Sequence, residues 1–192
     1  MSPILESIGS VKGFGWGALA AEGTFESIST TTLSTSTATI TFSSIPATYT
    51  HLQIRGIART DRAAAKQDAA RIRFNSDTGS NYALHYLLGD GISASAGAST
   101  SITSTFSDGF TCAGVASSIF GVAVIDILDY KNTNKYKTMR SLSAWDDNGD
   151  GRVWLESGLW QNTSAISTIT FTPNAGSNFV QYTQFALYGI KS

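Results

Sequence analysis

The feature that most constrains the fold is a succession of short runs rich in β-branched and aromatic residues, separated by clusters of Gly, Asn, Asp and Ser. Runs of this kind are typical of strands joined by tight turns. No segment has an apolar stripe at helical spacing. The best helix candidate, 61–70, is so short that a helix there would be marginal, and we expect a loop or a single turn. We predict strands at 24–32, 37–43, 49–59, 69–75, 81–88, 100–106, 119–129, 136–145, 152–160, 165–172 and 179–190.

Alternation of apolar and polar residues supports these strands. In the run 49–59, Leu52, Ile54 and Ala58 share one face, opposite His51, Gln53 and Arg55. In the run 152–160, Val153, Leu155 and Leu159 lie opposite Arg152, Trp154, Glu156 and Trp160. Because side chains alternate across a strand, this period of two predicts strands rather than helices. The sequence therefore predicts an all-β, jelly-roll-like antiparallel β-sandwich with an extended N-terminal arm.

The run 119–128 differs from the others because it is apolar on both faces. A strand of this kind is expected at the centre of a sheet that is covered on both sides. A lone two-layer sandwich leaves one face of each sheet wet, so the run indicates a further covered surface, such as a subunit interface. The C-terminal run 179–190 gives the same indication, with Phe185 and Leu187 opposite Tyr182, Ala186, Tyr188 and Ile190.

The chain divides into two parts by composition. Residues 1–23 alternate apolar residues with glycines, and we predict a docking arm there that precedes a sandwich domain at 24–192. The arm has neither the basic start nor the unbroken apolar core of a signal peptide. No run approaches the about 18 apolar residues that span a membrane, so we expect no membrane insertion. The docking residues of the arm would be Ile4, Leu5, Ile8, Phe14 and Trp16.

Charge and cysteine content limit the possible partners. The 13 basic and 14 acidic residues give a net charge of −1, which builds no field for nucleic acid. Only 14% of residues are charged, against about 25% in average proteins. The single cysteine, Cys112, is expected to be a small core residue. The low-complexity stretch 93–101 is predicted to be a surface loop.

Residues for catalysis are few, and we expect a protein without enzymatic activity or cofactor. His51 and His85 are the only possible bases of a nucleophilic triad, and no Gly-x-Ser-x-Gly motif accompanies them. For glycoside hydrolysis, the candidate carboxylates are Asp126, Asp129 and Glu156, and no pair stands out. Asp77, Asp90 and Asp108 are predicted to be turn residues.

One segment resembles the start of a calcium loop. Asp146, Asn148, Asp150 and Gly151 occupy the expected positions, but Ser157 stands where a bidentate Glu is required. Asn-Gly and Asp-Gly pairs between two strands are typical of hairpin turns, which is the preferred interpretation, with weak calcium binding as the alternative.

Three tryptophans, Trp145, Trp154 and Trp160, flank or occupy the same predicted hairpin. Exposed in a row, they would bind sugars. Placed at an interface, they would form a subunit contact, since aromatic residues are enriched there, and they would serve equally well in core packing.

Several segments together resemble a group of small virion proteins of tailed phages, of the marine and cyanobacterial type. The resemblance covers most of the chain apart from the loop around 90–115. The segments that carry it are 2–8, 40–55, 74–82, 127–137, 158–163 and 185–191. It implies a virion component of the tail fibre or appendage kind and carries over no functional residue.

The expected function is therefore that of a phage virion structural protein, most simply a tail fibre or appendage component. It would dock on other virion proteins by its arm, form a homotrimer and display the sandwich for assembly or for binding a host surface glycan. It would be located in the virion, which is assembled in the host cytoplasm. The alternatives are a head decoration protein, a carbohydrate-binding module and, as an enzyme, a depolymerase.

Overall fold

The computed structural model describes residues 24–191. The predicted docking arm, with Ile4, Leu5, Ile8, Phe14 and Trp16, lies outside the described residues. The described chain is entirely of β type, and it contains no helix long and apolar enough to cross a membrane.

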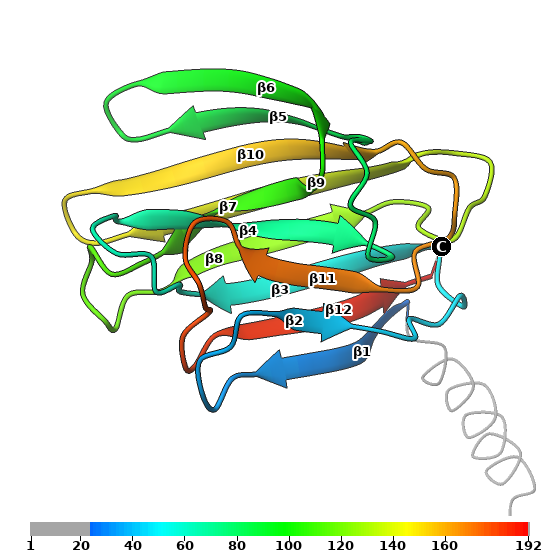
Figure 1. Ribbon diagram of the computed structural model, residues 1–192, viewed down its shortest axis with the longest axis horizontal. Coiled ribbons are helices and arrows are strands. Elements are labelled where there is room, and N and C mark those ends of the chain that lie inside the picture. Colours follow the sequence, from blue (N-terminus) through cyan, green and yellow to red (C-terminus); the bar gives the residue numbers. More distant parts are fainter. Residues whose placement is uncertain (1–23, 192) are drawn as a thin grey trace, which may run out of the picture.

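Two antiparallel sheets of unequal size pack face to face (Figure 1), as the alternating sequence pattern predicts. The larger sheet has eight strands in the order β1-β12-β3-β8-β9-β10-β5-β6, and the smaller has four in the order β2-β11-β4-β7. The strands are β1 (Phe25–Thr32), β2 (Ile40–Phe42), β3 (His51–Ala58), β4 (Gln67–Phe74), β5 (Tyr82–Gly89), β6 (Ala94–Ile102), β7 (Thr105–Thr111), β8 (Gly121–Ile127), β9 (Lys137–Asp146), β10 (Gly151–Trp160), β11 (Ile169–Pro173) and β12 (Gln184–Ile190).

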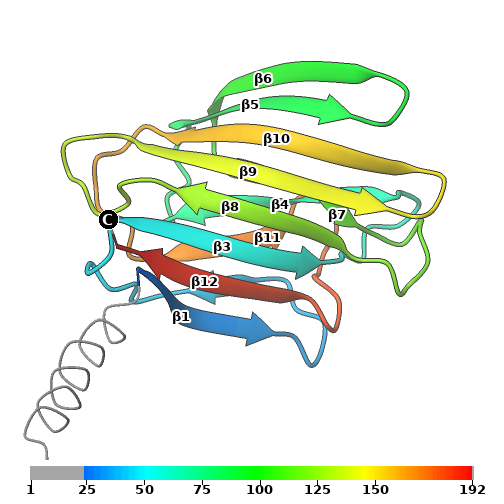
Figure 2. The ribbon, with the colours of Figure 1, turned by 180° about the vertical axis from the view of Figure 1, so that it is seen from behind.

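Most connections cross from one sheet to the other, and only β5–β6 and the β8–β9–β10 meander stay within the larger sheet. As a result, β8 and β9 lie in the middle of the eight strands, which confirms the central position expected for the doubly apolar run. Viewed from behind, the larger sheet has no described element over its outer face (Figure 2). The smaller sheet covers only the opposite, inner face (Figure 1).

One region departs from the sequence prediction. The stretch 93–101, expected to be a loop, forms most of β6. The strand expected at 100–106 is interrupted at 103–104, so its residues are divided between the end of β6 and the start of β7. β6 consists almost entirely of small residues and forms one edge of the larger sheet. The composition of β6 does not predict a strand, but its pairing with β5 makes it one. Strand formation depends more on context than on intrinsic preference.

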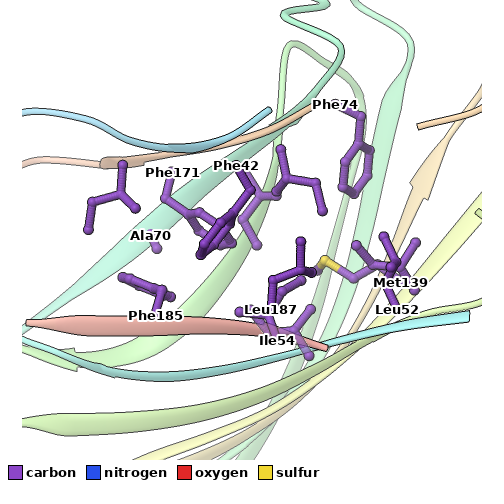
Figure 3. Close-up of a cluster of buried hydrophobic side chains, with 14 of the residues drawn as sticks. Phe42, Leu52, Ile54, Ala70, Phe74, Met139, Phe171, Phe185 and Leu187 are labelled. Carbon is purple, nitrogen blue, oxygen red and sulfur yellow. The ribbon is translucent and has the colours of Figure 1, made fainter. Parts of the chain in front are cut away.

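The main core lies between the two sheets and is rich in aromatic rings (Figure 3). Phe185 is at its centre, stacked on Phe171 with ring centroids 4.6 Å apart and meeting Phe179 edge-on at 5.6 Å. Gly56 lies under this ring, and a Cβ at that position would come within 2.7 Å of it. A glycine is therefore required for β3 to pass the aromatic cluster.

A second, smaller core lies beyond the edge of the four-stranded sheet. It contains the buried Val115, Trp145 and Trp154, and the loop 112–120 covers it. The buried Arg59 holds this loop in place, because its guanidinium donates to the carbonyl oxygens of Val115, Ala116 and Ile119 at 2.8 to 3.1 Å. Desolvation lowers the pKa of Arg59. Cys112, the first residue of this loop, is fully buried, as predicted.

Candidate interaction surface

Large aliphatic side chains cover the outer face of the eight-stranded sheet. They come from β3, β5, β8, β9 and β10, which are neighbours in the sheet, and each is between 40% and 54% exposed. We call this set the outer apolar surface. Its members are Ile57, Leu87, Val122, Val124, Leu142, Val153 and Leu155.

The strand register makes these side chains contiguous. One row across the sheet runs from Val124 to Leu142, Leu155 and Leu87. Directly opposite residues on neighbouring strands have Cβ atoms about 5 Å apart, so their side chains touch.

A second row, one level along the strands, runs from Ile57 to Val122, Ala144 and Val153. Five strands at about 4.8 Å spacing make the surface about 20 Å wide. Together the two rows form a patch of a few hundred Å², which is the size at which exposed apolar patches mark interaction sites.

A polar row borders the surface on one side. Arg140 and Asp126 form an ion pair of 2.7 Å across β9 and β8, and Gln53 donates to the other oxygen of Asp126 at 2.9 Å. Ser157 and His85 continue the row across β10 and β5. Because the charges in this row are already paired with each other, the border is polar without carrying a large field of one sign.

The surface is not flat. A hollow of about 250 Å³ lies among Val122, Val124, Leu142 and Val153, and a second of about 310 Å³ lies between Leu87 and Leu155. Beyond the second row, the surface continues into an open hollow of about 700 Å³ that Phe120 and Val122 help to line. Such hollows offer places for the side chains of a partner.

The two runs that are apolar on both faces, 119–128 and 179–190, differ in how far their outer faces are covered. In β8, Val122 and Val124 are exposed, so cover on this side is absent within residues 24–191. In β12, Ala186 is buried, and Tyr188 is stacked against Phe25 of β1 at 4.8 Å. The outer face of β12 is thus largely covered within the chain, and the indication of an interface drawn from the C-terminal run is weaker than that from β8.

The tryptophans do not form an exposed platform. Trp145, Trp154 and Trp160 are only 5%, 3% and 1% exposed, because all three point to the inner side of the larger sheet. The indole N–H of Trp160 donates to Asp77 at 2.7 Å. Core packing is the interpretation that holds, and a row of exposed tryptophans for sugar or subunit contact is wrong for the described chain.

The candidate carboxylates Asp126, Asp129 and Glu156 do not form a pair with one another. Glu156 instead lies beside Asp108, a pairing that was not predicted from the sequence. Asp126 pairs with Arg140, and Asp129 with Lys135 at 2.7 Å. Glu156 is buried between the sheets, where both of its oxygens accept the backbone N–H of Asp108, at 3.1 and 3.2 Å. Asp108, predicted to be in a turn, is instead part of β7.

Burial raises the pKa of Glu156 to about 10, and the neighbouring Asp108 carboxyl adds to the rise. Desolvation also raises the pKa of Asp108. Glu156 is therefore protonated at neutral pH. With 1% exposure it is out of reach of a substrate, so this pair is a structural element of the core.

The segment 146–151, which resembles the start of a calcium loop, forms the hairpin turn between β9 and β10, as the preferred interpretation predicted. Asn148 has a φ of 63°, and the N–H of Asp147 bonds to the carbonyl of Asp150 at 2.9 Å. The turn also occupies its carboxylates, since Asp146 accepts the N–H of Asn148 and Asp150 binds Lys66 at 2.8 Å. Among residues 24–191, no three His, Cys, Asp or Glu side chains form a cluster that could hold a metal ion.

The other predicted polar residues have local partners. Asp77 and Asp90 are turn residues, as expected, and accept backbone N–H groups two residues ahead, from Gly79 and Ile92. His51 accepts the N–H of Asp129 through Nδ1 at 3.0 Å.

Sequence reasoning found part of the outer apolar surface. It singled out the run containing Val122 and Val124, and it placed Val153 and Leu155 on one face. It missed Ile57, Leu87 and Leu142, because their membership depends on a register that no local signal reveals. No family model, no curated protein and no solved structure matches the chain, so its function is inferred from this surface.

Proposed function

We propose that this protein is a non-enzymatic structural subunit of a larger assembly, and that a neighbouring subunit covers its outer apolar surface. The observation that carries the proposal is the contiguous exposure of seven large aliphatic side chains on five adjacent strands. Exposed apolar residues are ordinary when they are scattered, whereas a contiguous patch on a soluble domain is typical of an interaction site.

Energetics supports a covered surface. Removing apolar surface from water stabilises by about 25 cal/mol per Å², so covering a few hundred Å² contributes several kcal/mol. Association costs a comparable amount in lost freedom of motion. The patch therefore supports an interface that also draws on other contacts, as subunits in a large assembly have.

The assembly that we propose is the virion of a tailed phage, with a tail fibre or appendage as the first candidate and head decoration as the second. The sequence resemblance described above supports this, together with the hydroxyl-rich, weakly charged composition. A homotrimer is the expected oligomer. Residues 1–23 are the proposed attachment to a carrier protein.

A matched pair of variants on β10 tests the interface. Leu155 lies within the outer apolar surface, and Ser157 lies two residues further on the same face, in the polar row. We expect the wild-type chain to associate in sedimentation velocity as its concentration rises. Leu155→Asp should abolish this association, because it places a charge in the interface, and Ser157→Asp should preserve it.

Equal association of the two variants would contradict the assignment of the interface, and a wild-type chain that stays monomeric at all concentrations would contradict self-association. Circular dichroism and the unfolding midpoint of each variant establish that it is folded.

The virion assignment requires a separate experiment. An antibody raised against the purified chain should label particles of the virus whose genome encodes it. Labelling at the tail, in few copies, supports an appendage, and labelling over the whole head supports decoration. Particles that contain none of the chain, by mass spectrometry and by labelling, would overturn the proposal.

A further inference from the structure

Two charged side chains on the outer face of the larger sheet have no partner of opposite charge within residues 24–191. Arg55 points outward from β3 and Asp146 points outward from the end of β9, since exposed and buried residues alternate along both strands. The other Asp, Glu, Lys and Arg side chains on the outward faces of β3, β8, β9 and β10 are Arg140 and Asp126, which pair with each other. This face therefore carries one unpaired positive and one unpaired negative charge.

The guanidinium of Arg55 is held in place with its end left open. Its Cζ lies 5.4 Å from the ring centroid of Phe25 and 5.6 Å from that of Tyr188. Its Nε donates to the side-chain oxygen of Gln53 at 3.1 Å, and its Nη1 and Nη2 have no hydrogen-bond partner in the described chain. Two neighbouring N–H groups of a guanidinium match the two oxygens of a carboxylate. Because the side chain is already ordered, it loses little freedom when a carboxylate binds.

Asp146 is a carboxylate that can meet such a guanidinium. Its Oδ1 accepts the N–H of Asn148 at 2.8 Å, and its Oδ2 accepts no hydrogen bond from residues 24–191. The ammonium of Lys66 lies at this hairpin but is paired with Asp147 and Asp150, at 3.5 and 2.8 Å. Asp146 also lines the open hollow of about 700 Å³ beyond the second row, so there is room beside it for a side chain from another chain.

Arg55 and Asp146 cannot reach each other within one chain. Arg55 is opposite Val124 in the strand register, Val124 is opposite Leu142, and Asp146 follows Leu142 by four residues on β9. The strands β3, β8 and β9 lie side by side (Figure 2). Two strand spacings across the sheet and four residues along a strand place the two Cα atoms about 17 Å apart. An ion pair between these two residues therefore has to join different chains.

A second copy of the chain, placed face to face with the first, supplies both missing partners. In a two-fold interface, a contact from one residue to another is always accompanied by the reverse contact. The axis that exchanges Arg55 and Asp146 lies in the plane of the interface, along the line equidistant from the two. Val122 is midway between them, and Leu155 lies on the same line, about 14 Å from each. The axis thus passes over the outer apolar surface and places aliphatic side chains of the two copies together.

The size of the face is also sufficient. Eight strands of roughly eight residues measure about 34 by 26 Å, which is close to 900 Å². A stable interface covers about 800 Å² of each partner. A copy laid over this face can therefore bury the area that a stable pair needs.

We propose that the subunit covering the outer apolar surface is a second copy of this chain, related by a two-fold axis, and that Arg55 of each copy binds Asp146 of the other. This inference rests on the proposed function and adds the identity and orientation of the neighbouring subunit. A face that pairs with itself joins chains two at a time. The expected homotrimer would then need three-fold contacts on another surface, and the pairing would join two trimers.

The first test turns the ion pair into a covalent bond. Arg55→Lys keeps the charge and supplies a primary amine. A water-soluble carbodiimide activates the Asp146 carboxyl, and attack by the amine forms an amide while the carbodiimide leaves as a urea that carries the carboxyl oxygen. Mixing isotope-labelled and unlabelled chains lets mass spectrometry distinguish links between chains from links within one. We expect the amide to join position 55 of one chain to Asp146 of another. Arg71→Lys, at an exposed arginine of β4 bonded to Asn174, should give no link to Asp146.

The second test exchanges the two charges. Arg55→Asp and Asp146→Arg each bring like charges together twice in the interface, so each should weaken association in sedimentation equilibrium by roughly tenfold or more. The double variant re-forms both pairs with the opposite polarity and should associate at least roughly threefold more tightly than either single variant. Circular dichroism establishes that each variant is folded.

The results that would overturn the inference differ from those that would overturn the proposed function. Association that persists without an amide between position 55 and Asp146 of different chains would exclude the two-fold pairing and leave a covered surface standing. An associated mass of three chains, or a double variant no tighter than the single ones, would do the same. A wild-type chain that stays monomeric at all concentrations would contradict self-association itself, and this inference with it.

Discussion

The two faces of the eight-stranded sheet are similar in composition and different in environment. In β8, Ala123, Ile125 and Ile127 point inward and are at most 3% exposed, whereas Val122 and Val124 point outward and are 49% and 40% exposed. The residues are of the same kind in the same strand. The difference comes from the smaller sheet, which covers the inner face and has no described counterpart on the other side.

In β10 the difference between the two faces is not the one that hydrophobicity alone predicts. The aliphatic Val153 and Leu155 point outward, and Glu156 points inward together with Trp154 and Trp160. The large rings fill the space between the sheets, and Glu156 is hydrogen-bonded there, as buried polar groups generally are. The comparison teaches that alternation identifies which residues share a face, while the partner lying over that face decides which side is buried.

The largest expected effect is on the inner face. Trp160→Ala should lower the free energy of unfolding by about 3–5 kcal/mol, because it removes a buried ring and leaves a cavity. Trp160 packs against Phe74 and Tyr82, with centroids 5.6 and 6.3 Å away, and bonds to Asp77. Urea unfolding followed by circular dichroism measures the change. A loss below about 1 kcal/mol would mean that this part of the core is not packed as described.

A pair of neighbouring residues compares the two faces directly. Ile125→Ala, on the inner face of β8, should cost about 2–5 kcal/mol. Val124→Ala, the adjacent residue on the outer face, should change stability by about 0.5 kcal/mol or less in dilute, dissociated protein. Unfolding curves at low protein concentration measure both. Similar losses in the two variants would show that the outer face is covered within a single chain.

The buried carboxyl pair gives the inner face a pH dependence. Unfolded Glu156 loses its proton near its ordinary pKa of 4.5, whereas the folded side chain keeps its proton up to about pH 10. The unfolded state thus binds fewer protons within this window, so stability should fall as pH rises from about 5 to 10. Between pH 5 and pH 8 this corresponds to about 1.4 kcal/mol for each pH unit, so we expect a loss of up to about 4 kcal/mol.

Glu156→Gln should flatten this dependence, since the amide oxygen still accepts the N–H of Asp108 and no longer titrates. Urea midpoints measured across the pH range provide the test. A wild-type protein that becomes more stable over the same range would contradict the buried, protonated carboxyl.

The accuracy of the strand and surface predictions made from the sequence differs from region to region. The predicted bounds of β8 and β10 lie within two residues of the observed ones, because β-branched runs and Gly-Asp turns mark these strands clearly. β6 was missed, because small residues carry no strand signal and its order comes from β5. The outer apolar surface was predicted only in part, because its membership depends on strand register. The hydrogen bond from Arg152 to Gln67 was not predicted, because it joins segments that are distant in the sequence.

The central claim, that the outer apolar surface is covered in the assembled protein, is tested most directly by the reactivity of a thiol placed within it. The native Cys112 is fully buried, so Val124→Cys and, on the outward face of β2 in the other sheet, Thr41→Cys each add one accessible thiol. In the associated protein, maleimide should label position 124 at least roughly tenfold more slowly than position 41, because the partner excludes water and reagent there. Equal labelling rates at the two positions, in protein shown by its mass to be associated, would contradict the account.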